Sequence, residues 1–405
     1  MNGPSHIKLV TLAFQALRRM PAGARREFEA AMRETCMLPD VHAIPILEGR
    51  RGAWRRYLPP RIQPFNFQIS DRSPRAYLPP LGFFIRKVVA CIRSADVAEA
   101  GRYAGVFSHY LGDFAEPAHY YELDVGRLAP PPAHMKNCNY HMMLEGIGSG
   151  LRRVKHRPAL LGASGGELEF RLGGRFAALR AESVAAVLPM LRSIYRRRSA
   201  RASKVFDGVM ASASRVLADF CHSCWCVGAK EYDEGELDAL RACDLRDVLP
   251  QDYDVEFNFS QVPLVDVITL EPYGCSEPFR LYSRRGRRKA ARAVGGICTI
   301  PHALPLKGTT PSATLVYRLP RGTYSEFRAT AGLLAGPERQ AKCRFEVRAD
   351  DRRLYRSRWM RPGDLAEPVE VDVTRCKLLA LKVHTDGSTD RLAYPIWGEP
   401  VLRKP

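Results

Sequence analysis

The chain has 405 residues, of which 46% are apolar and 26% charged. This composition excludes an intrinsically disordered protein, and two domains are expected at this length. The 62 lysines and arginines against 43 aspartates and glutamates give a formal charge of +19, which favours anionic partners, although a general arginine bias would explain the excess as well.

Up to about residue 246 the apolar residues recur at three- and four-residue steps, which is typical of amphipathic helices. Proline-rich segments such as YLPPRIQPF and LAPPPAH separate these helical stretches. The pattern predicts an all-α domain over residues 1–246, with helices in 6–20, 21–37, 84–111, 176–198 and 204–221.

Within this half, two pairs of possible metal ligands have helical spacing. His109 and Asp113 lie four residues apart, as do His141 and Glu145, so each pair falls on one helix face. Zinc binds imidazole and carboxylate groups, and His119 lies between the two pairs. One such pair alone would be better explained as a surface contact, but two pairs with a linking histidine and flanking apolar helix faces favour a metal centre.

The stretches HYLGDFAEPAH, residues 109–119, and NYHMMLE, residues 139–145, resemble the motifs of the zinc-dependent phospholipase C and S1/P1 nuclease family. The resemblance covers most of residues 3–155. It implies an all-α fold with up to three zinc ions and a phosphodiester hydrolase of the phospholipase C type. The substrate would be a phospholipid or, alternatively, a nucleic acid.

The resemblance also assigns roles to single residues. His109 and Asp113 would bind the first zinc, with Asp113 bridging to a second. The segments GPSHIKLVTLAFQAL and MLPDV resemble further family elements, which makes His6 a ligand of the bridged pair and Asp40 both a ligand and the residue that assists the attacking water. The third, more distant zinc would be held by His119, His141 and Glu145.

Two departures from the family pattern concern the bridged pair. No tryptophan precedes His6, and Arg55 or Arg56 stands where the family has a histidine. Arginine stays protonated and cannot bind zinc, so His42 or His134 would have to substitute for that ligand. A non-catalytic protein that keeps zinc and binds glycans is therefore the alternative to the enzyme.

After a linker at residues 247–262, the pattern changes to short alternating runs between Gly, Pro and Asp turns, which predicts a β-sandwich over 263–405. Its ordered motifs, from LPLKGTTPSATLVYRL to DRLAYPIWGEPVL, resemble the NPCBM carbohydrate-binding module, a galactose-binding-like jelly roll. The resemblance implies a glycan partner, a structural calcium and an exported or cell-surface location, although no signal peptide is visible. Tyr394, Trp397 and Trp359 could bind sugar or belong to the core.

The densest cysteine cluster is CHSCWC, residues 221–226. A zinc site of the C-x-x-C type would need a second cysteine pair, and none follows. The sequence therefore favours buried thiols at a helix end for Cys221, Cys224 and Cys226 over a metal or redox role.

Overall fold

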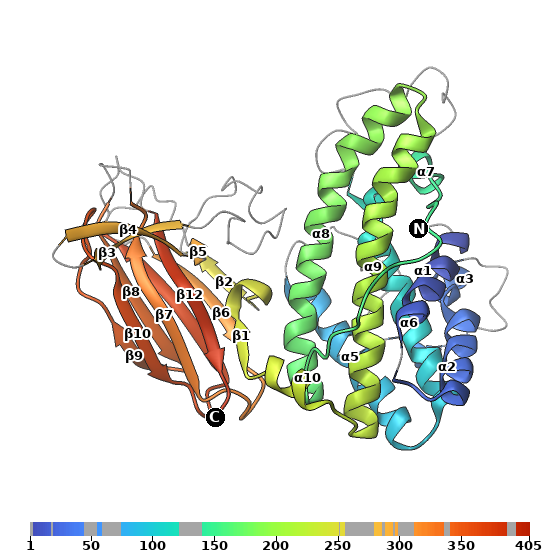
Figure 1. Cartoon of the computed structure of the whole chain (residues 1–405), viewed down its shortest axis with the longest axis horizontal. Coiled ribbons are helices and arrows are strands. Elements are labelled where there is room, and N and C mark those ends of the chain that lie inside the picture. Colours follow the sequence, from blue (N-terminus) through green and yellow to red (C-terminus); the bar gives the residue numbers. More distant parts are fainter. Residues whose placement is uncertain are drawn as a thin grey trace. The chain divides into compact units, whose positions relative to one another are not determined.

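The computed structural model describes residues 3–17, 19–43, 55–58, 74–120, 140–250, 252–255, 279–285, 288–294, 296–298, 312–335, 341–386 and 394–405. It divides into two compact units, a helical unit over Met1–Leu237 and a β unit over Asp238–Pro405 (Figure 1). The predicted order of an all-α part followed by an all-β part is thus confirmed. No helix in these ranges is long and apolar enough to cross a bilayer.

The helical unit is built around α6, whose residues are nearly all buried. Helices α1, α2, α5, α8 and α9 surround it in Figure 1. The helices and 3-10 turns are α1 (Gly3–Ala16), α2 (Ala22–Thr35), α3 (Leu38–Ala43), η2 (Arg55–Tyr57), α5 (Pro74–Arg93), α6 (Val97–Ala115), η3 (Pro117–His119), α7 (Tyr140–Glu145), α8 (Gly165–Tyr195), α9 (Ser199–Ala229) and α10 (Glu234–Ala239).

The helical stretch predicted at 84–111 is two helices, α5 and α6, rather than one. The chain reverses at Ala95, which has a φ of 58°, and Asp96 then caps the new helix by accepting a hydrogen bond from the backbone N–H of Glu99 at 3.1 Å. Because apolar residues continue at helical spacing on both sides, periodicity alone does not reveal this turn.

Close packing of α2 on α6 depends on two glycines of α6. A Cβ atom at Gly101 would lie 2.5 Å from the carbonyl oxygen of Phe28, and one at Gly105 would lie 2.5 Å from the carbonyl oxygen of Met32. No larger residue fits at either position without moving α2. This close approach fixes α2, and with it the segment that leads into α3.

An aromatic core joins α5, α6, α8 and α9. The rings of Phe107 and Phe220 stack with centroids 3.9 Å apart, and Phe84 meets Phe107 edge to face at 5.7 Å. Phe176 of α8 packs against Phe114 at 4.9 Å. These side chains are at most 4% exposed, so the core holds α6 in place from the side opposite α2.

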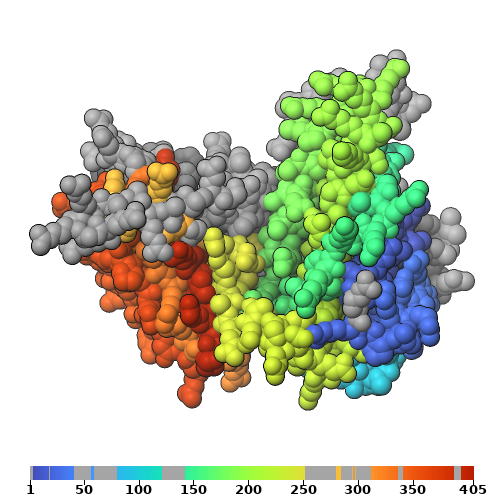
Figure 2. Space-filling model, in the orientation of Figure 1, coloured from blue at the N-terminus to red at the C-terminus, as the bar shows by residue number. Residues whose placement is uncertain are grey.

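The α8–α9 hairpin, green to yellow-green in Figure 2, extends beyond the other helices of its unit. Its tip carries Arg196, Arg197 and Arg198, all exposed, and Arg197 has a φ of 53°. The basic stretch IYRRRSARASK is therefore a solvent-facing cluster of positive charge.

In the described residues, the β unit contains two five-stranded antiparallel sheets and a hairpin, β3–β4. One sheet has the order β1-β12-β7-β10 with β5 also paired to β12, and the other has the order β2-β6-β11-β8-β9. The strands are β1 (Ala242–Asp244), β2 (Asp252–Val255), β3 (Phe279–Arg285), β4 (Arg288–Val294), β5 (Gly296–Cys298), β6 (Ser312–Arg318), β7 (Glu326–Leu333), β8 (Cys343–Ala349), β9 (Arg352–Arg356), β10 (Glu367–Asp372), β11 (Leu378–Thr385) and β12 (Pro395–Arg403), with the turn η6 (Leu245–Asp247) after β1.

The units divide at Leu237/Asp238, whereas the sequence suggested residue 246 and a linker at 247–262. Strand β1 already pairs with β12, with Cys243 opposite Leu402, and β2 pairs with β6. Residues 242–255 therefore contribute to both sheets before the predicted sandwich begins. The partners of these two short strands lie 58 or more residues away, which no local pattern in the sequence reveals.

Candidate metal centre

Three helices and one 3-10 turn bring the predicted ligands of the helical unit together. His6 lies on α1, Asp40 on α3, His109 and Asp113 on α6, and His119 at the end of η3. Both α1 and α3 pack against α6, as Figure 1 shows. Residues that are more than 100 positions apart in the chain thus meet at the carboxyl-terminal end of α6.

The Asp113 carboxylate is the point at which the histidines converge. Its Oδ1 lies 3.3 Å from Nε2 of His6 and 3.8 Å from Nε2 of His119, while its Oδ2 lies 3.1 Å from Nε2 of His109. The His109 Nε2 atom is also 3.2 Å from Oδ1 of Asp40. The rings of His6 and His109 stack in parallel, with centroids 4.1 Å apart.

The tautomer of His109 is set by the backbone. Its Nδ1 lies 2.7 Å from the carbonyl oxygen of Cys36, so Nδ1–H donates to that oxygen and Nε2 is the atom that faces the two carboxylates. A hydrogen bond from the second ring nitrogen is the usual way in which proteins orient a histidine toward a metal.

Gly112 explains the glycine of the HYLGD stretch. A Cβ atom at this position would lie 2.7 Å from Nδ1 of His6, which is closer than real contacts allow. The absent side chain leaves the space that the fully buried His6 ring occupies beside α6.

Burial and charge act in opposite directions on these groups. Burial opposes protonation of His109, but the negative charge and hydrogen bonds of Asp113 and Asp40 raise its pKa to about 9. Burial, together with the charge of neighbouring His109, lowers the pKa of His6. Although burial alone would raise the pKa of Asp113, the positive charges of the N-terminal amino group and of His109, with hydrogen bonds from His109 and His6, hold it well below its usual range. Asp113 is therefore an anion between two imidazoles.

This arrangement fits zinc. Nδ1 of His6 has no hydrogen bond among the described residues, and an unsatisfied buried donor or acceptor costs about 1–3 kcal/mol. Ligands of tetrahedral zinc at about 2.0–2.1 Å from the ion lie roughly 3.3 Å from one another. The His6–Asp113, His109–Asp40 and His109–Asp113 distances, 3.3, 3.2 and 3.1 Å, are close to this value. The ligand atoms of His6, Asp40 and His109 all lie within 4.8 Å of one another. Each oxygen of Asp113 faces a different histidine, so the carboxylate could bridge two ions.

The predicted third site is described only in part. Helix α7, which carries His141 and Glu145, packs against η3, which carries His119. The side chain of His141 lies outside the described part of the structure, as do that of His42 and the whole of His134. His119, assigned from the sequence to the distant zinc alone, also lies at the edge of the Asp113 centre.

Glu116 is a residue of this region that the sequence analysis missed. It is 1% exposed, and burial, with a smaller contribution from the negative charge of Glu145, raises its pKa to about 7. The hydrogen bond that its carboxylate accepts from the Ala118 N–H acts in the opposite direction. Its position directly before Pro117 could have indicated this role, because the residue before a helical turn commonly caps the turn through its side chain. Glu116 is therefore a second titratable carboxyl group close to Asp113 in the chain.

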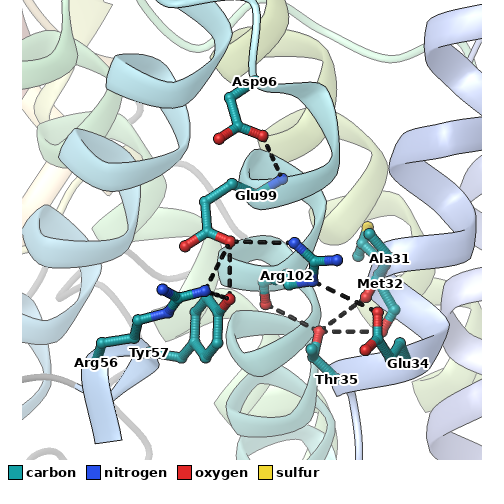
Figure 3. A network of polar contacts seen from close by, with 9 residues as sticks. All are labelled: Ala31, Met32, Glu34, Thr35, Arg56, Tyr57, Asp96, Glu99 and Arg102. Atoms are coloured by element: carbon teal, nitrogen blue, oxygen red, sulfur yellow. Dashed lines mark hydrogen bonds and ion pairs between the residues drawn. The ribbon is translucent and has the colours of Figure 1, made fainter. Parts of the chain in front are cut away.

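The side chain of Arg56 is part of a polar network around Glu99. Its Nη2 atom lies 2.6 Å from the Tyr57 hydroxyl and 3.4 Å from the Glu99 carboxylate, which also accepts a hydrogen bond from Tyr57 at 2.7 Å (Figure 3). Arg102 joins the same carboxylate at 3.3 Å. Figure 3 shows Glu99 at the centre of this network, which attaches η2 to α6. The side chain of Arg55 lies outside the described residues.

In the β unit, Trp397 follows the second of the two alternatives that the sequence left open for it, a position in the core rather than one that binds sugar. Trp397 is 0% exposed and packs edge to face on Phe345 of the opposite sheet, with centroids 5.0 Å apart. It belongs to the core of the sandwich because its side chain points inward from β12. Tyr394 is partly exposed at the start of that strand. Trp359 is 36% exposed, and the guanidinium of Arg344 lies over its ring at 4.6 Å.

Comparison with known proteins identifies the C-terminal module. Residues 307–403 match the family model of the NPCBM/NEW2 domain, so the β unit contains a carbohydrate-binding module of this type. No curated protein matches this chain significantly.

Several solved structures are similar to the C-terminal part. The CBM51 module of GH95 from Clostridium perfringens, in complex with methyl-galactose, is 20% identical and covers 40% of this chain and 99% of its own, with a TM-score of 0.29. The CBM51-2 and INT domains of Clostridium perfringens ZmpB, in complex with GlcNAc, are 16% identical and cover 40% of this chain and 32% of theirs, with a TM-score of 0.30. The tandem CBM51 modules of Sp3GH98, a family 98 glycoside hydrolase from Streptococcus pneumoniae, are 14% identical and cover 41% and 47%, with a TM-score of 0.31.

The chain thus spans about a third of the length of the two ZmpB structures that contain the CBM51-2 and INT domains. The assignment of the C-terminal module rests on the family match over residues 307–403.

Proposed function

We propose that this protein is a zinc-dependent phosphodiester hydrolase of the phospholipase C type, which its C-terminal module attaches to glycans. The observation that carries the first part is the Asp113 carboxylate, which faces His6 through one oxygen and His109 through the other. The NPCBM/NEW2 match supports the second part.

The side chains of the centre differ in solvent exposure, and this difference suggests different roles. His109 and His6 are buried and fixed, whereas the Asp40 side chain is 48% exposed. Asp40 is therefore the member that a water molecule or substrate reaches, and its carboxylate can orient that water and accept its proton. Bound zinc would supply Lewis acidity and neutralise the charge on the phosphodiester oxygens.

An anionic substrate agrees with the charge of the chain. Besides the formal +19, the exposed arginines at the tip of the α8–α9 hairpin present positive charge on the helical unit. A phospholipid surface that carries glycans would engage both units of one protein, which is why we favour lipid over nucleic acid as the substrate.

The test combines metal content with hydrolysis. We expect the zinc-loaded protein to release the phosphorylated head group from phosphatidylcholine vesicles, and Asp113→Asn to lose this activity together with more than one zinc per chain. Glu182→Gln, which changes an exposed carboxylate of α8, is the matched control and should keep both.

The other outcomes decide between the alternatives. Hydrolysis of single-stranded DNA without hydrolysis of lipid would replace the phospholipase by a nuclease of the S1/P1 type. Zinc binding without hydrolysis of either substrate would refute the enzyme and leave a zinc-containing glycan-binding protein. This last alternative has to be tested because Arg56 pairs with Glu99 and cannot replace the histidine ligand of the family.

A further inference from the structure

A second group of possible metal ligands lies in the helical unit, on elements that contribute nothing to the Asp113 centre. It consists of His222 and Cys226, one turn apart near the end of α9, and Glu236 of α10. The ligand atoms of these three residues all lie within 4.8 Å of one another. We infer that His222, Cys226 and Glu236 form a separate structural zinc site that fastens α10 to the end of α9.

The distances suit a tetrahedral ion. Nε2 of His222 lies 3.0 Å from Oε1 of Glu236 and 3.8 Å from Sγ of Cys226. Zinc bonds of about 2.0–2.1 Å to nitrogen or oxygen and about 2.3 Å to sulfur place neighbouring ligands roughly 3.3–3.6 Å apart. Small rotations of the side chains bring the three atoms to these separations, with a water molecule as the fourth ligand.

Arg19 orients the carboxylate without occupying the atom that faces the histidine. Its Nη1 pairs with Oε2 of Glu236 at 3.2 Å, and its Nη2 pairs with Asp233 at 2.8 Å. Glu236 therefore presents Oε1 to His222 while its other oxygen is held by the guanidinium. Outer groups of this kind commonly fix metal-binding carboxylates.

The charges balance when zinc is bound. A zinc ion with the Cys226 thiolate and the Glu236 carboxylate is neutral, and Arg19 with Asp233 forms a second neutral pair. The side chain of His222 is 6% exposed and that of Glu236 is 14% exposed, so an unbalanced charge here would be costly. A mixed imidazole, thiolate and carboxylate set favours zinc over calcium or magnesium.

His222, Cys226 and Glu236 lie where α9 ends and α10 begins. Lys230 ends α9 with a φ of 59°, and Asp233 caps the next helix by accepting a hydrogen bond from the Gly235 N–H at 2.9 Å. Because α10 has six residues and no buried side chain, packing alone does little to hold it. A metal between α9 and α10 would fix the last element before the β unit begins in the chain.

Cobalt substitution tests this site separately from the Asp113 centre, since none of that centre's assigned ligands is a cysteine. We expect the full chain, stripped of metal and loaded with Co²⁺, to show thiolate-to-cobalt charge-transfer absorption in the near ultraviolet. Cys226→Ser should abolish this band, and Glu236→Gln should weaken it and lower cobalt affinity at least tenfold. Cys91→Ser, which changes a half-buried thiol of α5, is the control and should retain it.

Asp113→Asn should also retain the band, so the failure of the proposed function would leave this result unchanged. Absence of charge-transfer absorption in the wild type would overturn the proposal, as would a band that persists in a folded Cys226→Ser protein. Circular dichroism of each variant establishes that it is folded. If Cys226→Ser fails to fold, persistence of full cobalt affinity in Glu236→Gln would refute the site.

Discussion

The contact between Gly112 and His6 gives the most direct test of the centre's geometry. Replacing Gly112 by alanine adds a Cβ atom 2.7 Å from the His6 ring, inside a fully buried region. Gly208 of α9 offers a matched control, because it is also within a helix but has no atom within 4 Å of its added Cβ. The two substitutions make the same chemical change in different surroundings.

The expected change in the free energy of unfolding follows from two opposing effects. Alanine in place of glycine inside a helix stabilises it by about 0.5–1 kcal/mol, and this gain applies at both positions. Overpacking of a buried contact costs about 1–3 kcal/mol and applies at Gly112 alone. We therefore expect Gly208→Ala to raise the free energy of unfolding, whereas Gly112→Ala lowers it or at best leaves it unchanged. The difference between them, about 1–3 kcal/mol, isolates the packing cost.

Chemical denaturation of the full chain, followed by the helical circular-dichroism signal in the presence of a chelator, measures this difference without a contribution from bound metal. Zinc content of the reloaded proteins is the second measurement. We expect Gly112→Ala to bind zinc less tightly, because the His6 ring has to move. If Gly112→Ala were stabilised as much as Gly208→Ala and kept its zinc, the placement of His6 against α6 would be refuted.

Three further predictions follow from the described contacts. Trp397→Ala should destabilise the β unit by about 3–5 kcal/mol in a denaturant titration, whereas Trp359→Ala should cost less than about 1 kcal/mol and weaken glycan binding measured by calorimetry. Glu99→Ala should cost about 1–3 kcal/mol, since it leaves the Tyr57 hydroxyl without its acceptor, against about 1 kcal/mol for loss of the helix cap in Asp96→Ala. For protein in free zinc at 100 times the zinc dissociation constant, chelation should lower the free energy of unfolding by about 2.7 kcal/mol, seen as a lower melting temperature.

Much of the fold could be predicted because its signals are local. Strands β6, β7, β8, β10 and β11 all lie within residues 263–405, where the alternating pattern predicts a β-sandwich. The break at Ala95 and the early strand β1 could not be predicted in this way. The first depends on a single residue with positive φ inside an apolar pattern, and the second on a partner strand at the far end of the chain.

The ligand group was predictable in part for a related reason. His109 and Asp113 share a helix face by spacing, but only the family resemblance pointed to His6 and Asp40. Their meeting at Asp113 depends on the packing of α1 and α3 against α6. For aromatic residues the sequence offers no such guide, because burial depends on which face of a strand a side chain leaves. Trp397 and Trp359 look alike in the sequence, yet one is in the core and the other is exposed.

The contacts at Asp113 also bear on the arginine, Arg55 or Arg56, that stands where the family has a histidine, because they leave the proposed centre other ligands. Asp113 already has a histidine on each oxygen, and His109 has a second carboxylate in Asp40. With His119 at its edge, the ion next to His6 would have two imidazoles and one carboxylate, which is a common three-ligand set for catalytic zinc. Arg56, meanwhile, has its charge engaged by Glu99. The arginine therefore removes one ligand that the resemblance implies for the bridged pair, while His6, His109, Asp113 and Asp40 still lie together.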